Sequence, residues 1–182
     1  MEIIKTGFEG LLVIQPKVFF DDRGYFYEAF RADILAKLDV KIEFVQDNFS
    51  RSKKNTIRGM HYQVGKNAQG KLCQVIFGKV LDTALDIRYN SPTYGKYYSH
   101  ELSDANHTMI WIPPGFAHGF SVLSDEAVFM YRCTAYYSKE DERSILYNDP
   151  DLNIDWKVDV PLVSGKDLKA KRFKEIEKDF VL

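Results

Sequence analysis

The residues best suited to chemistry in this chain lie in the run Arg58-Gly59-Met60-His61-Tyr62-Gln63. It places a basic side chain, a turn-permissive glycine and an imidazole close together in a run that otherwise reads as a strand. An unperturbed histidine has a pKa of about 6.5, so it takes and gives protons near neutral pH. The sequence therefore offers His61 as a candidate acid–base group.

Two further polar elements lie downstream of this run. Gly70-Lys71 opens one β-rich segment, and Pro113-Pro114-Gly115-Phe116-Ala117-His118-Gly119 leads into another. Their spacing fits neither a single helix face nor a compact metal motif, so only neighbouring strands could bring them to one pocket. A barrel interior that holds His, Lys and Tyr is costly to desolvate, and stability alone would favour Val and Leu there. These polar residues therefore indicate a functional pocket.

A metal site is one alternative use of the histidines, which are His61, His100, His107 and His118. A β-barrel metal site needs two histidines close in sequence, as His-x-His, with a carboxylate and a third histidine. No such pair is present, so only His61 and His118 could act together, and two scattered histidines make a poor ligand set. We expect no bound metal, and we expect His100 and His107 to face solvent.

Strands are the elements that must position these residues. Short runs rich in β-branched and aromatic residues recur along the chain and are separated by turn residues. Strands are expected over Leu11–Gln15, Tyr25–Phe30, Glu43–Phe49, Thr56–Gln63, Lys71–Phe77, Val80–Arg88, Tyr97–Leu102, Met109–Ile112, His118–Leu123 and Val128–Tyr137. Many evenly spaced strands with little helix predict an all-β sandwich or double-sheet barrel.

Side chains alternate between the two faces of a strand, which predicts the partners of each polar residue. Arg58 and His61 fall on opposite faces of their strand unless Gly59 introduces a bulge. Tyr131 and Tyr137 share one face of the last long strand if that strand is regular. Taken alone, both tyrosines read as ordinary strand aromatics that pack in the core.

Helices are expected only at two flanking positions. Ala32–Leu38 is compatible with a short helix. In the tail, Phe173, Ile176 and Phe180 follow the spacing i, i+3, i+7, which predicts an amphipathic helix over 167–180 packed on a sheet.

Length and charge bound the class of protein. The 182 residues fit a single domain over 1–182, and 25 Lys and Arg against 26 Asp and Glu give a net charge of −1. This charge gives no overall attraction to nucleic acid or to an anionic membrane, and no apolar run reaches the ~20 residues of a membrane helix. The first residues do not resemble a signal peptide, so we expect a cytoplasmic protein in which Cys73 and Cys133 are reduced thiols.

Several motifs in a fixed order resemble one family. They are Asp22-Arg23-Gly24-Tyr25-Phe26, Phe44-Val45-Gln46-Asp47-Asn48, Arg58–Gln63, Gln69-Gly70-Lys71-Leu72, Pro114–Phe120 and Asp149-Pro150-Asp151. From Leu11 to about Lys169 the chain resembles the dTDP-4-dehydrorhamnose 3,5-epimerases, cupin-fold enzymes of nucleotide-sugar metabolism. The resemblance implies a double-stranded β-helix jelly roll with short flanking helices, a homodimer, and a reaction that needs no metal and no cofactor.

The resemblance also implies a reaction, the epimerisation of a dTDP-4-keto-6-deoxyhexose at C3 and C5 in dTDP-rhamnose biosynthesis. Inverting a carbon beside a ketone requires removing a proton from one face, stabilising an enolate and returning a proton to the other face. By resemblance, His61 is the general base and Asp167 orients its imidazole. Lys71 places positive charge beside the enolate oxygen, and Tyr131 is the acid on the opposite face.

Substrate-binding positions follow from the same resemblance. Contacts to the diphosphate or sugar are matched by Arg23, Arg58 and Lys166. Contacts to the base and ribose are matched by Glu28, Gln46, Asp47 and Asn48. Tyr137 matches the ring that stacks on thymine, and His118 and Glu142 match further positions in the substrate pocket.

Two alternatives stay open. One is a sugar-binding cupin without catalysis, and the other is a sibling enzyme that epimerises a single carbon, or isomerises the ketone, of a related nucleotide-linked 4-keto sugar. The sequence does not separate single from double epimerisation, because that choice depends on sub-ångström placement and on how long the intermediate stays bound. The departures from the family pattern, at Met60, Leu81-Asp82-Thr83 and Gly165, remove no chemical group.

Overall fold

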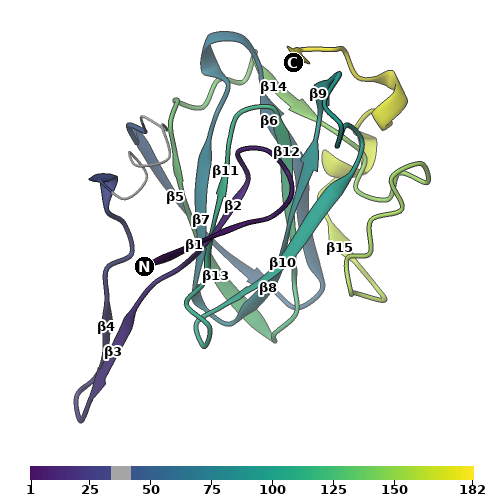
Figure 1. Cartoon of the computed structure of the whole chain (residues 1–182). Coiled ribbons are helices and arrows are strands. Elements are labelled where there is room, and N and C mark those ends of the chain that lie inside the picture. Colours follow the sequence, from purple (N-terminus) through teal and green to yellow (C-terminus); the bar gives the residue numbers. More distant parts are fainter. Residues whose placement is uncertain (34–41) are drawn as a thin grey trace.

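β-Strands make up almost all of the regular structure in the computed structural model, which describes residues 1–33 and 42–182 (Figure 1). Two large sheets form the body of the molecule. Across the first sheet the order is β1 (Glu2–Lys5), β2 (Leu12–Gln15), β11 (Met109–Ile112), β7 (Lys71–Phe77), β13 (Glu126–Cys133) and β5 (Gln46–Lys53). The pairs within it are antiparallel.

The second sheet carries the strand on which His61 lies. Its order is β10 (Tyr97–Ser103), β8 (Lys79–Asp86), β12 (Phe116–Val122), β6 (Thr56–Gln63) and β14 (Glu142–Ser144), and β15 (Leu162–Val163) pairs with β6 in parallel. Two smaller sheets join β3 (Val18–Asp21) to β4 (Gly24–Tyr27), and β9 (Arg88–Tyr89) to β16 (Phe180–Val181).

The main hydrophobic core lies between the two large sheets. It takes Val75 and Phe129 from the first sheet and Ala84 and Phe120 from the second. The rings of Phe120 and Phe129 stack across the core with their centroids 4.3 Å apart. Burying a side chain of this size contributes about 1.5–3 kcal/mol, so this layer holds the sheets face to face.

The expected strands are present, but several have different ends. The strand predicted over Tyr25–Phe30 ends at Tyr27, and the one predicted over Val80–Arg88 is divided into β8 and β9. The strand predicted over Glu43–Phe49 begins at Gln46 and continues to Lys53, because β5 is an edge strand that needs only the backbone of β13 as its partner. The strand predicted over Val128–Tyr137 runs instead over Glu126–Cys133, so Tyr137 lies beyond its end. The prediction that Tyr131 and Tyr137 share one strand is therefore wrong.

The tail is not the amphipathic helix predicted over 167–180. It forms two short 3₁₀ helices, η2 (Asp167–Lys169) and η3 (Phe173–Glu175), followed by β16. The apolar residues Phe173, Ile176 and Phe180 do pack on a second core cluster. Their backbone follows another path because β16 pairs with β9, and pairing with a strand replaces the internal hydrogen bonds of a helix.

Other helical structure is sparse. A third 3₁₀ helix, η1, covers Gly65–Asn67, and the helix expected over Ala32–Leu38 falls mostly outside the described residues. Within 1–33 and 42–182, no helix has the length and apolar character required to cross a membrane.

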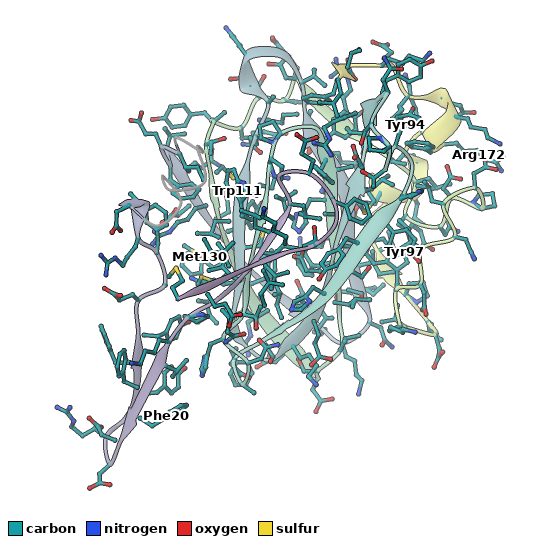
Figure 2. The ribbon with its side chains drawn as sticks, in the orientation of Figure 1. Phe20, Tyr94, Tyr97, Trp111, Met130 and Arg172 are labelled. Atoms are coloured by element: carbon teal, nitrogen blue, oxygen red, sulfur yellow. The ribbon has the colours of Figure 1, made fainter. Side chains whose placement is uncertain are left out.

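The hairpin of β3 and β4 projects away from the body of the molecule (Figure 1). Phe19, Phe20, Tyr25 and Phe26 on this hairpin are between 51% and 73% exposed. Figure 2 shows Phe20 extending from the hairpin well away from the two sheets. Clustered exposed aromatic side chains of this kind are typical of a surface that another protein covers.

Candidate active site

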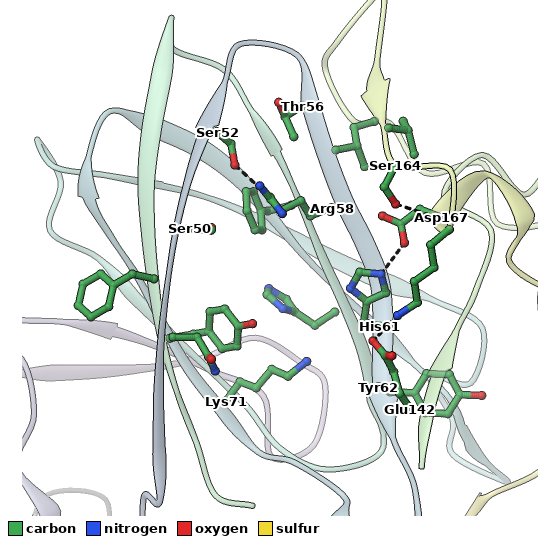
Figure 3. A pocket seen from close by; sticks show the side chains of 18 of the residues that line it. Ser50, Ser52, Thr56, Arg58, His61, Tyr62, Lys71, Glu142, Ser164 and Asp167 are labelled. Carbon is green, nitrogen blue, oxygen red and sulfur yellow. Dashed lines mark hydrogen bonds and ion pairs between the residues drawn. The ribbon is translucent and has the colours of Figure 1, made fainter. Parts of the chain in front are cut away.

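A cavity of about 750 Å³ lies between the two large sheets (Figure 3). Ligand-binding pockets in proteins span roughly 300–1,000 Å³, so it has room for a small organic molecule. Most of the site residues expected from the sequence line it, namely Asn48, Arg58, His61, Lys71, His118, Tyr131, Tyr137, Glu142, Lys166 and Asp167.

A histidine–carboxylate pair lies on one wall of this cavity. The Nε2 atom of His61 on β6 lies 2.6 Å from Oδ1 of Asp167 in η2, across 106 positions of sequence. Burial alone would raise the pKa of Asp167, but the hydrogen bond from His61, the charge of His61 and hydrogen bonds from Ser164 and the backbone of Gly59 together outweigh burial and hold that pKa below its usual value. The carboxylate is therefore ionised near neutral pH and accepts the Nε2 proton, which leaves Nδ1 of His61 free to accept another proton.

A bulge at Gly59 brings Arg58 into the same cavity as His61. The register of β6 against β12 pairs His61 with His118 but Arg58 with Phe120, so β6 has one extra residue between the two pairs. The φ angle of Gly59 is +136°, and a Cβ atom there would lie 2.9 Å from the carbonyl oxygen of His118. Only glycine fits this close approach, so the bulge that the sequence left conditional is present.

Lys71 and Tyr131 lie on neighbouring strands at the inner end of the cavity. The Lys71 ammonium is 6.0 Å from the centre of the Tyr131 ring, and only 8% of the lysine is exposed. Burial lowers the pKa of Lys71, and it raises the pKa of Tyr131 to about 12. The pair thus combines a desolvated cation with a phenol that keeps its proton over the whole physiological range.

Asp82, for which the sequence predicted no role, forms a second histidine–carboxylate pair. Its Oδ2 atom lies 2.8 Å from Nε2 of His118, and the residue is fully buried on β8. His118 and His61 are cross-strand neighbours, so the two pairs lie on adjoining strands. The available signal was an aspartate on the same face as Ala84, within the mostly apolar run Val80–Leu85.

One group of described residues has the donor types of a metal site. The ligand atoms of Cys73, Asp82 and His118 lie within 4.8 Å of one another, and all three residues are buried. Thiolate, carboxylate and imidazole are zinc ligands. However, burial raises the pKa of the Cys73 thiol well above its usual value, and Asp82 already shares a hydrogen bond with His118. These three residues are therefore better described as a neutral Cys73 thiol beside the hydrogen-bonded pair of Asp82 and His118 than as a metal site.

Four of the expected binding residues do not line the cavity. Arg23 pairs with Asp21 at 2.6 Å, and its side chain is 90% exposed. Glu28 lies 3.5 Å from Arg31. Oδ1 of Asp47 lies 3.7 Å from Nε of Arg132. Asp47 is exposed, whereas the next residue along β5, Asn48, is half-buried. Gln46 lies near the rim, where its Oε1 accepts the backbone N–H of Tyr137 at 2.9 Å.

The prediction that His107 faces solvent is wrong. Only 7% of this residue is exposed, and its ring packs under Tyr25 and Tyr27 with centroid distances of 4.6 and 5.1 Å. The reason is tertiary, because Tyr25 and Tyr27 of β4, far away in sequence, cover the histidine ring. His100 is partly buried rather than exposed, and its Nδ1 lies 3.4 Å from the hydroxyl of Tyr98.

Comparison of the sequence with known proteins shows which family this chain belongs to. Residues 5–175 match the family described as dTDP-4-dehydrorhamnose 3,5-epimerase. The chain is 49% identical over 174 residues to the dTDP-4-dehydrorhamnose 3,5-epimerase of Shigella flexneri, covering 95% of this chain and 96% of that protein. The chain belongs to the dTDP-4-dehydrorhamnose 3,5-epimerase family.

Solved structures of similar proteins share the fold of this family. The dTDP-6-deoxy-D-glucose-3,5-epimerase of Legionella pneumophila, in complex with dTDP-4-keto-L-rhamnose, matches with a TM-score of 0.92 and 48% identity over 97% of this chain and 94% of that one. A more distant 3'-monoepimerase from Streptomyces bikiniensis, in complex with dTDP-quinovose, matches with a TM-score of 0.88 and 29% identity over 92% and 86%. The all-β cupin-type fold expected from the sequence is thereby confirmed.

Proposed function

We propose that the protein is an isomerase that epimerises dTDP-4-keto-6-deoxyglucose at C3 and C5, to give dTDP-4-keto-rhamnose. The observation that carries the proposal is the meeting of the His61–Asp167 pair with Lys71 and Tyr131 in one cavity. These groups are a base, a fixed cation and a protonated acid. Membership of the epimerase family supports the choice of substrate.

The first step is removal of a proton from the carbon beside the ketone. Nδ1 of His61 takes this proton, and the buried Asp167 carboxylate stabilises the imidazolium that forms. The electron pair moves onto the ketone oxygen as an enolate. A fixed cation in a site shielded from water stabilises such charge by several kcal/mol, which is the role we assign to Lys71.

The second step returns a proton to the opposite face of the same carbon. Tyr131 is the donor, and its raised pKa of about 12 keeps the phenol protonated until the enolate carbon takes the proton. The resulting phenolate lies close to the Lys71 ammonium. Once the His61 imidazolium has released its proton to solvent and the Tyr131 phenolate has taken one back, the two steps repeat at the other carbon and invert both centres, and neither step requires a metal or a cofactor.

The remaining lining residues form the nucleotide site. Arg58 and Lys166 supply positive charge for a diphosphate, Asn48 is placed to contact the nucleoside, and His118 faces the sugar. Tyr137 is 55% exposed at the rim, as a ring that stacks on thymine must be. These local cations attract an anionic ligand even though the whole chain carries a net charge of −1.

We further propose that the enzyme is a cytoplasmic homodimer of the dTDP-rhamnose pathway. Arg23 and Glu28 lie outside the cavity of their own chain, at the projecting hairpin and just beyond its end. They can bind substrate only if the hairpin of one protomer reaches the cavity of its partner. The exposed aromatic residues on the hairpin support this arrangement, since pairing two chains would bury them.

Single-carbon epimerisation remains the second candidate function. The observation that favours it is the shared fold of the 3'-monoepimerase from Streptomyces bikiniensis. A monoepimerase needs the same base and enolate site, and it differs in whether the second carbon reaches the base before the product leaves.

Proton NMR in D₂O with dTDP-4-keto-6-deoxyglucose tests the proposal. Double epimerisation predicts deuterium at both C3 and C5 and signals of a product inverted at both carbons. Exchange and inversion at one carbon would identify a monoepimerase. Binding without any exchange would identify a sugar-binding cupin and contradict the proposed reaction.

A further inference from the structure

Glu142 is a carboxylate placed among the cations of the cavity. Two acidic side chains among the described residues line the cavity: Asp167 is bonded to His61, and Glu142 is bonded to two residues of the rim. Oε1 of Glu142 lies 2.5 Å from the Lys166 ammonium, and its Oε2 accepts the hydroxyl of Tyr137 at 3.0 Å. Figure 3 shows Glu142 beside His61 in the cavity.

The Glu142 side chain is held by three separate segments. Glu142 lies on β14, where it pairs with Gln63 of β6, whereas Lys166 directly precedes η2 and Tyr137 follows β13. Its side chain is 17% exposed, compared with 54% for Lys166. The carboxylate is therefore the fixed member of the ion pair, and the lysine is the member free to move.

This carboxylate is charged at the pH of the proposed reaction. Burial works to raise the pKa of Glu142, but hydrogen bonds from Lys166 and Tyr137 and the nearby His61 outweigh burial and hold that pKa below its usual value. A nucleoside diphosphate is also an anion. A fixed negative charge beside a diphosphate site weakens binding, so direct contact with the ligand's phosphates does not explain why the residue is there.

We propose that Glu142 is an internal counter-ion, which the diphosphate of the ligand displaces from Lys166. The inference rests on the proposed function, because it assumes a nucleoside diphosphate at this rim. In the chain alone, Glu142 holds the Lys166 ammonium over the cavity and the Tyr137 ring at its edge. A diphosphate competes for the ammonium with more charge and more acceptor oxygens. Glu142 is therefore a positioning residue whose charge lowers affinity for the nucleotide and speeds its release.

Calorimetric titration of dTDP and of thymidine into the Glu142→Gln variant tests this exchange. The glutamine carbonyl can still accept the Tyr137 hydroxyl, but the charge that competes for Lys166 is gone. We expect dTDP to bind about threefold to tenfold more tightly than to wild type at low salt, as the loss of a partly exposed ion pair allows. Thymidine, which lacks phosphate, should bind equally to both proteins. Equal or weaker dTDP binding in the variant overturns the inference.

Two comparisons separate exchange from other effects of charge. Glu140→Gln removes the same charge from an exposed neighbour and should leave dTDP affinity unchanged. In a Lys166→Met background the gain from Glu142→Gln should shrink, because no ammonium remains to be released. An undiminished gain there would mean that Glu142 only repels the diphosphate, without being displaced from Lys166, and would overturn the inference.

A second variant covers the case in which Glu142→Gln does not fold. Glu142→Asp, which shortens the reach to Lys166, should also bind dTDP more tightly, and unchanged or weaker binding counts against the inference.

Failure of the inference and failure of the proposed function give different results. Wild-type protein that binds dTDP and inverts the sugar, with no gain in the variant, would overturn only the role of Glu142. Wild-type protein that binds no dTDP at all would overturn both.

Discussion

At the scale of single residues, the hydrogen bond from His61 to Asp167 decides which nitrogen of the proposed base can accept a proton. The carboxylate occupies Nε2, so in the proposed reaction the proton from the sugar goes to Nδ1. His61→Asn removes this acceptor, and we predict that deuterium uptake from D₂O stops at both carbons. Binding of dTDP should stay within a few-fold of wild type, since the nucleotide contacts are formed by other residues.

The matched control for His61 is His100→Asn. His100 is a partly buried histidine on β10 that does not line the cavity, so its replacement should leave the exchange rate unchanged. Substantial exchange in His61→Asn would assign the base to another group.

Tyr131→Phe separates proton removal from proton delivery. The variant keeps the shape and packing of the ring but loses the phenolic proton, while His61 can still form the enolate and return a proton to the same face. We predict that NMR in D₂O shows continued deuterium exchange at one carbon or more. Net inversion should fall by about 10²–10⁴-fold, the usual contribution of general acid catalysis.

Two outcomes would contradict this role of Tyr131. If inversion at both carbons survives within a few-fold of wild type, water or another side chain is the acid. If exchange and inversion disappear together, Tyr131 acts earlier, in placing the sugar.

At the scale of elements, the bulge at Gly59 fixes which side chains of β6 enter the cavity. Gly59→Ala would drive a methyl group into the backbone of β12 and would strain a φ angle of +136°. We predict a loss of about 1–3 kcal/mol in the free energy of unfolding, as for other overpacked sites. Urea unfolding measures this loss. Gly165→Ala, where a Cβ atom would meet nothing within 4 Å, should leave stability nearly unchanged, and equal effects of the two changes would refute this reason for the glycine.

The end of β8 is stabilised by Asp86, which is fully buried outside the cavity. Its carboxylate accepts hydrogen bonds from Arg88 at 2.7 Å, Ser91 at 2.7 Å and Thr93 at 2.6 Å. Burial acts to raise the pKa of Asp86, but these bonds outweigh burial and keep that pKa below its usual 3.8. Because the folded state binds this proton less readily than the unfolded state, the stabilisation is full above the unfolded pKa and is lost as pH falls through the folded pKa.

Asp86→Asn should therefore cost about 3–5 kcal/mol at pH 7, the usual effect of breaking a buried ion pair. The difference from wild type should stay constant down to pH 5 and shrink below the ordinary aspartate pKa of 3.8. Urea unfolding at several pH values measures both effects. A difference that is already smaller at pH 5 than at pH 7 would assign the acid sensitivity to other groups.

At the scale of the whole molecule, the projecting hairpin predicts that one active site uses two chains. Arg23→Ala and Lys71→Ala should each be nearly inactive alone. In a mixed dimer, the Arg23→Ala chain supplies an intact cavity, and the Lys71→Ala chain supplies an intact hairpin. Random mixing of the two should restore about a quarter of wild-type activity, because half of the dimers are mixed and each has one complete site.

Light scattering and activity after mixing check this arrangement together. A mixture as inactive as its components would place Arg23 in the site of its own chain or outside catalysis. A monomeric mass at working concentrations would contradict the homodimer directly.

The sequence by itself determined the features that depend on near neighbours. Runs rich in β-branched and aromatic residues predicted the strands, and turn residues marked their approximate ends. Polar residues at strand positions, such as His61 and Lys71, pointed to a pocket because a purely structural core would not hold them. The ordered motifs pointed to the family, and both the family and the cupin-type fold are confirmed.

Only the tertiary structure decided which of these residues meet. Asp167 reaches His61 across 106 positions, and Arg58 enters the cavity because β6 bulges against β12. Neither contact is visible in local periodicity, since each depends on the register between strands far apart in sequence. The same cause made the tail two short 3₁₀ helices and a short strand instead of one helix, buried Asp82 beneath His118, and left Arg23 outside the cavity that its own chain forms. Local patterns fix the face on which a side chain lies, whereas long-range pairing of strands fixes what lies opposite that face.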